Sequence, residues 1–242
     1  MSLIIPDWPA PSRVRACSTS RHGGVSTAPW ASLNLGSHVG DKPADVACNR
    51  QRLIELASLP AMPQWLEQVH KTDVVRLAHS GQDTPQADAC ITSETGVVCA
   101  VMTADCLPVL FCSADGSEVA AAHAGWRGLC DGVLENTLAQ FRASPDQVHV
   151  WLGPAIGPDA FEVGEEIRSA FVTKDARAAV AFRPVGSKFY ANIWLLAHQR
   201  LQAAGVRSVS TETRCTVSEH ENFFSFRRDG VTGRMATLIW LL

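Results

Sequence analysis

Short apolar runs, each bounded by polar or glycine-rich residues, recur along the chain and predict the strands of β-sheets. Several of these runs are apolar throughout, which is typical of strands that are covered on both faces. The predicted strands are Val14–Thr19, Gln64–Val69, Val74–Leu77, Val97–Met102, Pro108–Cys112, Val119–Ala122, Val148–Leu152, Val206–Thr211 and Thr237–Leu241.

Helical spacing of apolar residues appears in fewer segments than the strand pattern does. Within residues 129–143, for example, Val133, Leu134 and Leu138 recur on one helical face. The predicted helices are Ala44–Ser58, Leu129–Ala143, Phe161–Val172 and Ile193–Ala204. Because the order of elements is no regular βαβ alternation, we expect an α+β fold with mixed sheets rather than a doubly wound sheet.

Composition narrows the class of protein. The 242 residues contain no linker, charge block or repeat that would divide them, so we expect a single domain over residues 1–242. The formal net charge of −3 gives no electrostatic reason to expect binding to nucleic acid or to an anionic membrane. A small-molecule substrate fits this charge better.

The sequence also indicates a compartment. The apolar start of the chain is too short for a signal peptide, and no stretch is long enough to span a bilayer. The eight cysteines form neither CxxC pairs nor a compact disulfide framework. We therefore expect reduced thiols and a cytoplasmic protein.

Residues that can bind metal or act as nucleophiles stand where predicted strands end. Cys106 lies between two apolar runs, His123 follows a third, and His70 follows the run that begins at Gln64. Strand ends are where proteins with α and β elements usually place their chemistry. We therefore interpret His70, Cys106 and His123 as one site, and such a His–Cys–His set would leave one coordination position of zinc open.

The residues alone leave other interpretations of this site open. Cys106 could act as a nucleophile paired with His123 or His70, with Asp105 orienting the imidazole. Alternatively, Cys106 is a small buried apolar residue and each histidine is bonded locally.

Three further segments offer groups for a ligand. The turn from His123 to Gly128 contains Arg127 and suits an anion, or is simply a tight turn with a solvated arginine. Residues 32–41 carry donors and acceptors suited to a sugar or a base. Residues 223–230 place two arginines after an aromatic cluster, which suits stacking and phosphate binding, or an aromatic core plug.

Eleven motifs, taken together, resemble the YfiH family, which has long been labelled multicopper polyphenol oxidase or laccase-like. The resemblance extends from about Ser18 to the C-terminus. The motifs are TSRHGGVS at 19–26, LNLG at 33–36, GD at 40–41, NR at 49–50, QVH at 68–70, TADCLPV at 103–109, AHAGWRG at 122–128, LGPAIG at 152–157, FEVG at 161–164, RCT at 214–216 and FSFRR at 224–228.

The resemblance implies a four-layer α/β/β/α sandwich and a metal, usually zinc, held at the positions of His70, Cys106 and His123. Copper is less expected, because one such set cannot supply the several centres of a laccase. The resemblance also implies phosphorolysis of adenosine, inosine and related nucleosides to base and ribose 1-phosphate. Adenosine deamination is a further implied activity, for which Asp105 would move the proton.

Within the matched motifs, Arg50 is the first candidate for phosphate and Arg127 the second. The remaining substrate contacts that we expect are Asn34, Gln68, Ser225, Arg227 and Arg228. Two positions depart from the family pattern, because Lys71 replaces a frequent glycine and Asn192 replaces a frequent acidic residue. We assign neither an inherited role.

Two other functions compete with the phosphorylase hypothesis. Bacterial relatives are also assigned peptidoglycan editing, in which an amidohydrolase removes a wrong residue such as serine from a UDP-muramoyl precursor. A third hypothesis makes the zinc structural and the surface a docking module. The sequence fixes neither the preferred nucleoside nor the oligomeric state.

Overall fold

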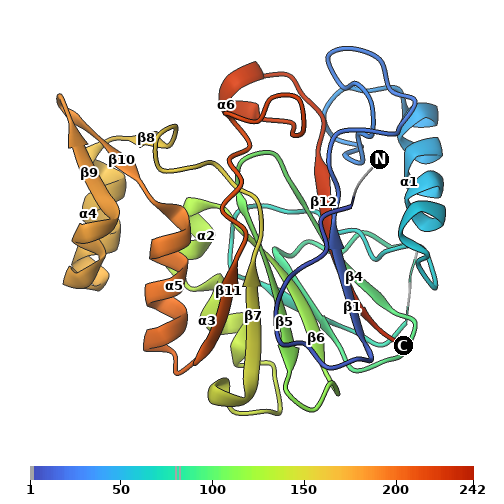
Figure 1. The fold of residues 1–242 in the computed structure, drawn as a ribbon, viewed down its shortest axis with the longest axis horizontal. Coiled ribbons are helices and arrows are strands. Elements are labelled where there is room, and N and C mark those ends of the chain that lie inside the picture. The colour runs from blue at the N-terminus through green and yellow to red at the C-terminus, as the bar shows by residue number, and fades with distance from the viewer. Residues whose placement is uncertain (1–2, 80, 82) are drawn as a thin grey trace.

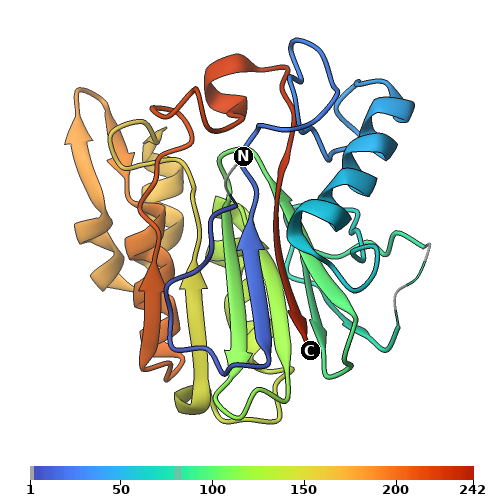
Figure 2. The ribbon, with the colours of Figure 1, turned by 45° about the vertical axis from the view of Figure 1, so that its right-hand side comes forward.

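The computed structural model describes residues 3–79, 81 and 83–242, and in it two β-sheets pack face to face with helices outside each (Figures 1 and 2). The larger sheet has six strands in the order β11-β7-β5-β6-β3-β2. These strands are β2 (Val74–Leu77), β3 (Ala89–Thr92), β5 (Leu107–Ser113), β6 (Val119–Ala124), β7 (Val148–Leu152) and β11 (Ser208–Thr211). Parallel and antiparallel neighbours are mixed in this sheet.

The smaller sheet has three antiparallel strands in the order β1-β12-β4. They are β1 (Val14–Ser18), β12 (Met235–Leu241) and β4 (Val98–Thr103). Along β4, Val98 and Ala100 face helix α1 (Pro43–Ala57), whereas Cys99 and Val101 face the six-stranded sheet. This alternation lets one apolar strand serve two core layers.

Between the sheets, Leu110 and Trp151 of the larger sheet pack with Ile239 of the smaller one. The outer face of the larger sheet is covered by α2 (Trp126–Asp131), α3 (Val133–Leu138) and α5 (Ile193–Ala203). The order of layers is therefore helix, sheet, sheet, helix, as the family resemblance implied.

A small sheet projects from this body at the left of Figure 1. It has the order β8-β10-β9 and packs against α4 (Glu165–Lys174) and the 3-10 helix Ala176–Ala181. Its strands are β8 (Glu162–Val163), β9 (Phe182–Val185) and β10 (Lys188–Ala191). The short helix α6 (Phe226–Asp229) lies above the ends of the main strands.

Several predicted elements differ from the structure. The helix predicted over 129–143 starts earlier, at Trp126, ends at Leu138, and is interrupted at Gly132, whose φ of 110° breaks the helical path. The helix predicted over 161–172 begins instead with strand β8, and its helical part starts after Gly164. In both cases a glycine lies where the regular element predicted from the sequence is broken.

The strand predicted over Gln64–Val69 is absent, since this segment makes only isolated bridges from Gln64 and Glu67. Its apolar character reflects burial of Trp65 and Leu66 in two different core clusters, not continuous strand pairing. The sequence also gave no signal for the short strands β3, β9 and β10.

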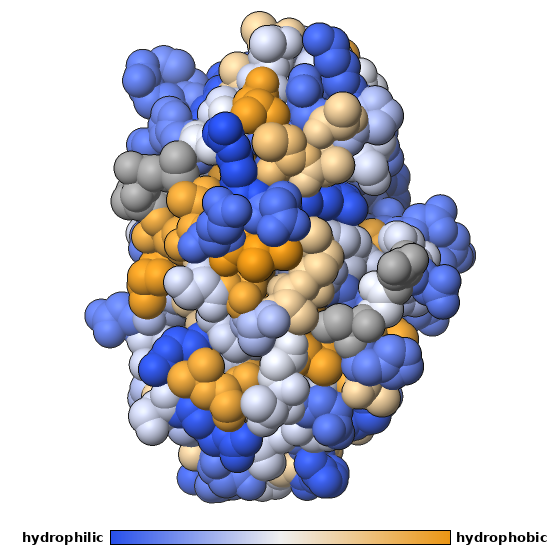
Figure 3. Space-filling model, turned by 90° about the vertical axis from the view of Figure 1, so that its right-hand side faces the viewer, coloured by the Kyte–Doolittle hydropathy of each residue, from blue (hydrophilic) through white to orange (hydrophobic). Residues whose placement is uncertain are grey.

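Hydrophilic residues interrupt the apolar ones over the face that carries α1 (Figure 3). Within the described residues, no helix is long and apolar enough to cross a membrane. All eight cysteines are free.

Replacing Leu110 by alanine tests the core between the sheets. Leu110 is fully buried there, so we expect Leu110→Ala to lower the free energy of unfolding by about 2–5 kcal/mol, measured by equilibrium denaturation in urea. Leu56→Ala makes the same chemical change on α1, where Leu56 is 37% exposed, and should cost less than about 1.5 kcal/mol. Equal losses in the two variants would contradict this packing.

Candidate metal centre

The structure brings His70, Cys106 and His123 together at one end of the six-stranded sheet. Cys106 immediately precedes β5, and Pro108 of β5 pairs with His123 near the end of the antiparallel neighbour β6. The pairing therefore sets Cys106 beside His123. His70 reaches them from the segment that leads into β2.

The three side chains have the spacing of a ligand set. One ligand atom from each lies within 4.8 Å of the others, and Cys106 Sγ is 3.8 Å from His70 Nε2. The imidazole rings of His70 and His123 stand at 82° to each other. A Cβ at Gly125 would lie only 2.7 Å from His70 Cδ2 and 3.2 Å from Cys106 Sγ, so the absence of a side chain there keeps the cluster open.

Asp88, at the start of β3, holds two members of the cluster in place. Its buried carboxylate accepts hydrogen bonds from the consecutive backbone N–H groups of Val69, His70 and Lys71, at 2.8–3.1 Å. It also accepts from Nδ1 of His123 at 2.8 Å. Since Nδ1 is bound to Asp88, Nε2 is the nitrogen that His123 has free for a ligand.

Charge separation is favoured between Cys106 and His123. Burial by itself would raise the pKa of the Cys106 thiol, but the charge and hydrogen bonds of His123 and His70 lower it to about 6. Burial likewise opposes protonation of His123, yet the thiolate and Asp88 raise its pKa to about 9. Without metal, the pair is therefore a thiolate and an imidazolium near neutral pH.

Asp105, next to Cys106, anchors the other side of the site. Its φ of 104° is unusual for a residue other than glycine. Its two carboxylate oxygens accept hydrogen bonds from Thr216 Oγ1 at 2.6 Å and from the backbone N–H of Arg227 at 2.7 Å. Asp105 thus ties the Cys106 turn to the start of α6.

These residues fit a zinc ion chemically. Zinc accepts thiolate and imidazole together, and ligands in a tetrahedral zinc site lie about 3.3–3.6 Å apart, close to the separation of Cys106 Sγ and His70 Nε2. An imidazole whose second nitrogen binds a carboxylate, as in His123, is the usual form of a metal-ligating histidine. Three protein ligands would leave a fourth position for a reactant.

Two chambers meet at Cys106. The first, the apolar chamber, has a volume of about 190 Å³ and is walled mainly by Trp126, Ile156, Phe161, Ile193 and Phe226. The second, the polar chamber, has a volume of about 230 Å³. It is lined by the candidate ligands His70, Cys106 and His123 together with His38, Gln68 and Arg234. Both include Ala104, Cys106 and Phe226, so the exposed Phe226 ring stands between them.

Two of the predicted substrate residues line these chambers. Gln68 borders the polar chamber, where its side-chain amide exchanges two hydrogen bonds with the backbone of Met102. Arg227 borders the apolar chamber and donates from Nη1 to the carbonyl of Glu162. Hydrogen bonds therefore hold both side chains beside the chambers that meet at Cys106.

Three other predicted residues have structural contacts instead. Asn34 is fully buried, and its side chain bonds Gly36 and Asp41. Ser225 is also fully buried and caps α6 by accepting from the N–H of Arg228. The guanidinium of Arg228 bonds backbone carbonyls of residues 216, 217 and 223.

The two predicted phosphate residues lie away from the cluster. Arg50 stacks over Trp65 and donates from Nε and Nη2 to the carbonyl of Leu35, at the edge of a further cavity that also includes His38. Arg127 is exposed and stacks over the Trp126 ring. Neither is among the residues that line the two chambers.

Two residues at the site, Asp88 and Arg234, lie outside all of the motifs quoted above. Asp88 stands before a short strand with no motif around it, and only the fold brings it to His123. Of the two departures from the family pattern, Asn192 caps α5 by accepting from the N–H of Leu195, and Lys71 contributes its backbone N–H to Asp88.

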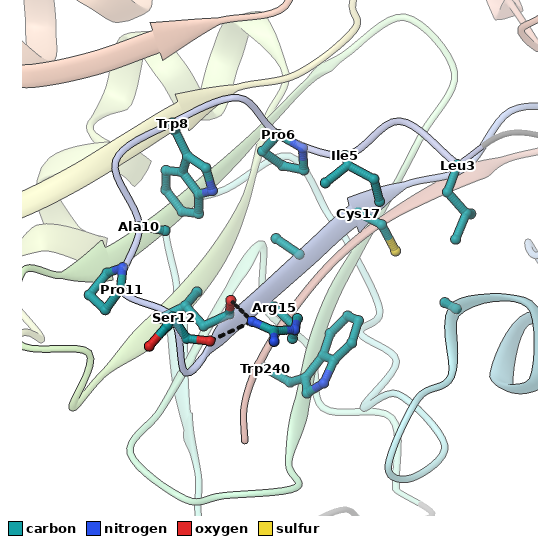
Figure 4. A pocket seen from close by; sticks show the side chains of 13 residues that line it. Leu3, Ile5, Pro6, Trp8, Ala10, Pro11, Ser12, Arg15, Cys17 and Trp240 are labelled. Carbon is teal, nitrogen blue, oxygen red and sulfur yellow. Dashed lines mark hydrogen bonds between the residues drawn. The ribbon is translucent and has the colours of Figure 1, made fainter.

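A larger cavity of about 420 Å³ lies between residues 3–12 and β1 (Figure 4). Arg15 on its wall is bonded to the carbonyls of Ser12 and Val14, and burial raises the pKa of the Cys17 thiol to about 12. Among the described residues, no group of three potential metal ligands borders it. The potential metal ligands therefore lie beside the smaller cavities at Cys106 and not beside this larger one.

Comparisons with known proteins show the family of this chain. Residues 15–242 match the model of a family described as multi-copper polyphenol oxidoreductase laccase. The chain is 56% identical over 240 residues to "Purine nucleoside phosphorylase YfiH" of Escherichia coli K12, covering 99% of each. It is 49% identical over 243 residues to "Purine nucleoside phosphorylase" of Haemophilus influenzae, again covering 99% of each.

Solved structures resemble the fold as closely. A Neisseria meningitidis protein superposes with a TM-score of 0.96 at 50% identity, over 100% of this chain and 99% of that one. YlmD from Geobacillus stearothermophilus gives a TM-score of 0.91 at 33% identity, over 99% of each chain. On the family match and these relatives, the chain belongs to the YfiH family of laccase-like proteins.

Proposed function

We propose that this protein is a zinc-dependent purine nucleoside phosphorylase that acts on adenosine and inosine. The observation that carries the proposal is the meeting of a His–Cys–His ligand set with two chambers of different polarity at Cys106. The names of the relatives, purine nucleoside phosphorylases, support the same reaction class.

The apolar chamber suits the purine. Trp126, Phe161 and Phe226 offer aromatic faces to a flat ring, and the burial of Ile156 and Ile193 excludes water around it. Arg227 at the edge of the chamber supplies a donor for the ring nitrogens or the exocyclic oxygen. A base in this chamber lies directly beside Cys106.

In phosphorolysis the bond between C1′ of the ribose and N9 of the purine breaks. Its electron pair leaves with the purine, which gains a proton, while a phosphate oxygen forms the new bond to C1′. His70, Cys106 and His123 would hold the zinc, which when bound supplies a Lewis acid beside the reacting groups. Asp88 orients His70 and His123, and Asp105 fixes the turn that carries Cys106 and the wall that carries Arg227.

Zinc fits this site better than the copper implied by the family's name. A laccase needs several copper centres, whereas His70, Cys106 and His123 form the only group of three potential ligands in the described residues. The thiolate and two imidazoles, with one position left open, are the donor set of a catalytic zinc.

Removing a ligand should abolish turnover. We expect Cys106→Ala and His123→Ala each to lower the release of base from inosine or adenosine by more than about 100-fold, the upper end for loss of a group that only orients a ligand. The measurement is chromatography of base and ribose 1-phosphate, with and without phosphate. Circular dichroism of the variants checks that they remain folded.

Cys48→Ala is the matched control, because Cys48 is exposed on α1 and lies outside both chambers. Near-normal activity in both ligand variants would contradict the site. Conversion of adenosine to inosine without phosphate would indicate deamination. Release of serine from a serine-containing muramoyl nucleotide, with no base release, would support the amidohydrolase instead.

Metal content gives an independent prediction. We expect one zinc per chain by elemental analysis and loss of it in Cys106→Ala. Asp88→Asn should weaken zinc binding by about 10- to 100-fold in competition with a chromophoric chelator, because His123 loses the carboxylate that orients it. An unchanged affinity in Asp88→Asn would refute the orienting role.

The metal-free protein should show the charge separation between Cys106 and His123. Because the pKa of Cys106 is about 6, its alkylation by iodoacetamide should rise as the pH increases through 6 and level off above it. In Asp88→Asn the rise should move to higher pH, since His123 is less readily protonated. Mass spectrometry of the Cys106 peptide follows the reaction, and a midpoint near 9 in the parent protein would overturn the assignment.

A further inference from the structure

Arg234 immediately precedes β12 and lines the polar chamber together with His70, Cys106 and His123. Its stem passes over Gly36, where an added Cβ would lie 2.8 Å from Arg234 Cγ. Its backbone N–H donates to the buried side chain of Asn34 at 2.9 Å. The LNLG motif at 33–36 therefore positions this arginine.

The guanidinium of Arg234 keeps donors available. Nη1 donates to the carbonyls of Thr232 and Gly233, whereas Nε and Nη2 have no acceptor within the described chain. Arg234 also forms no ion pair with any described carboxylate, and Asp105 is already bonded to Thr216 and Arg227. Burial lowers the pKa of Arg234, whereas the charges of Cys106 and Asp105 favour its charged form, and its Cζ lies 5.9 Å from the centre of the Phe226 ring.

Two basic residues, His38 and Arg50, stand near Arg234. His38 borders the same chamber and also the neighbouring cavity, which Arg50 lines from the other side. Burial, followed by the charges of Arg234 and Arg50, lowers the pKa of His38. The acidic residue along this cavity, Glu67, is exposed to solvent. An anion entering here would meet the free donors of Arg234. The negative groups that act on Arg234 are Asp105, which is bonded to Thr216 and Arg227, and Cys106, whose thiolate would be a ligand of the zinc.

We infer that Arg234, with His38 beside it, binds the phosphate that takes part in the reaction proposed above. This assignment rests on that proposed function and replaces Arg50 and Arg127 as the direct contacts to phosphate. A planar guanidinium with two free nitrogens offers the paired hydrogen bonds that phosphate oxygens accept. Arg50 then contributes a more distant positive charge behind His38.

The arrangement would place the two reactants in different chambers that meet at Cys106. The chambers share Cys106, Ala104 and Phe226, while their other walls differ. With the purine in the apolar chamber and phosphate on Arg234, the ribose C1′ lies at the junction. The phosphate oxygen then approaches C1′ from the side opposite the departing purine, as direct displacement requires.

The test compares Arg234→Gln with the zinc-loaded parent protein. We expect the KM for phosphate to rise roughly 10- to 100-fold, because the variant loses the charge-assisted paired hydrogen bonds to phosphate. The KM for inosine should stay within about twofold, because the apolar chamber is unchanged. Arg234→Lys keeps the charge without the planar fork and should fall between the two. Arg207→Gln, an exposed arginine before β11, is the matched control and should behave as the parent does.

A second measurement separates this inference from the proposed function. Inorganic phosphate alone should raise the Tm of the parent protein and of Arg207→Gln, but not that of Arg234→Gln with normal zinc content. If phosphate gives this pattern while no nucleoside is cleaved, the phosphate subsite stands and the phosphorylase proposal fails. An equal rise of Tm in Arg234→Gln, or an unchanged KM for phosphate in that variant, overturns the subsite.

Discussion

The geometry of the candidate metal centre depends on one buried carboxylate. Burial by itself would raise the pKa of Asp88, but its hydrogen bonds with His123 and with backbone N–H groups hold it below its usual value. The carboxylate is therefore ionised and fully bonded, which is the condition under which a protein tolerates a buried charge. Its partners include two of the three candidate ligands, so Asp88 joins the backbone of His70 to the His123 side chain that β6 carries.

Asp105 holds the elements around the apolar chamber in place, as Asp88 holds the candidate ligands. It connects the turn before β5 with Thr216 and with the first turn of α6, which carries Phe226 and Arg227. A residue other than glycine at φ 104° persists only where its contacts determine the conformation. The two carboxylates thus have different structural roles. Asp88 holds the candidate ligands His70 and His123, and Asp105 holds the turn of α6 that places Phe226 between the chambers.

Much of this organisation could be predicted from sequence, because uninterrupted apolar strands indicate sheets covered on both faces. Cys106 and His123 were predictable as neighbours, since both follow such strands. Asp88 was not, because a lone acidic residue before a four-residue strand has no periodicity or motif to mark it. Asn34 and Ser225 looked available for a ligand, and only their complete burial assigns them to positioning and capping.

The same ligand set suits several reactions, so the chambers around it decide the substrate. A zinc-bound thiolate and two imidazoles can serve amide hydrolysis, deamination or phosphorolysis alike. An aromatic chamber on one side of Cys106 and the free donors of Arg234 on the other suit a flat apolar group together with a separate anion. Of the three reactions, phosphorolysis is the one that consumes such a pair, because deamination and amide hydrolysis use water where phosphorolysis uses phosphate.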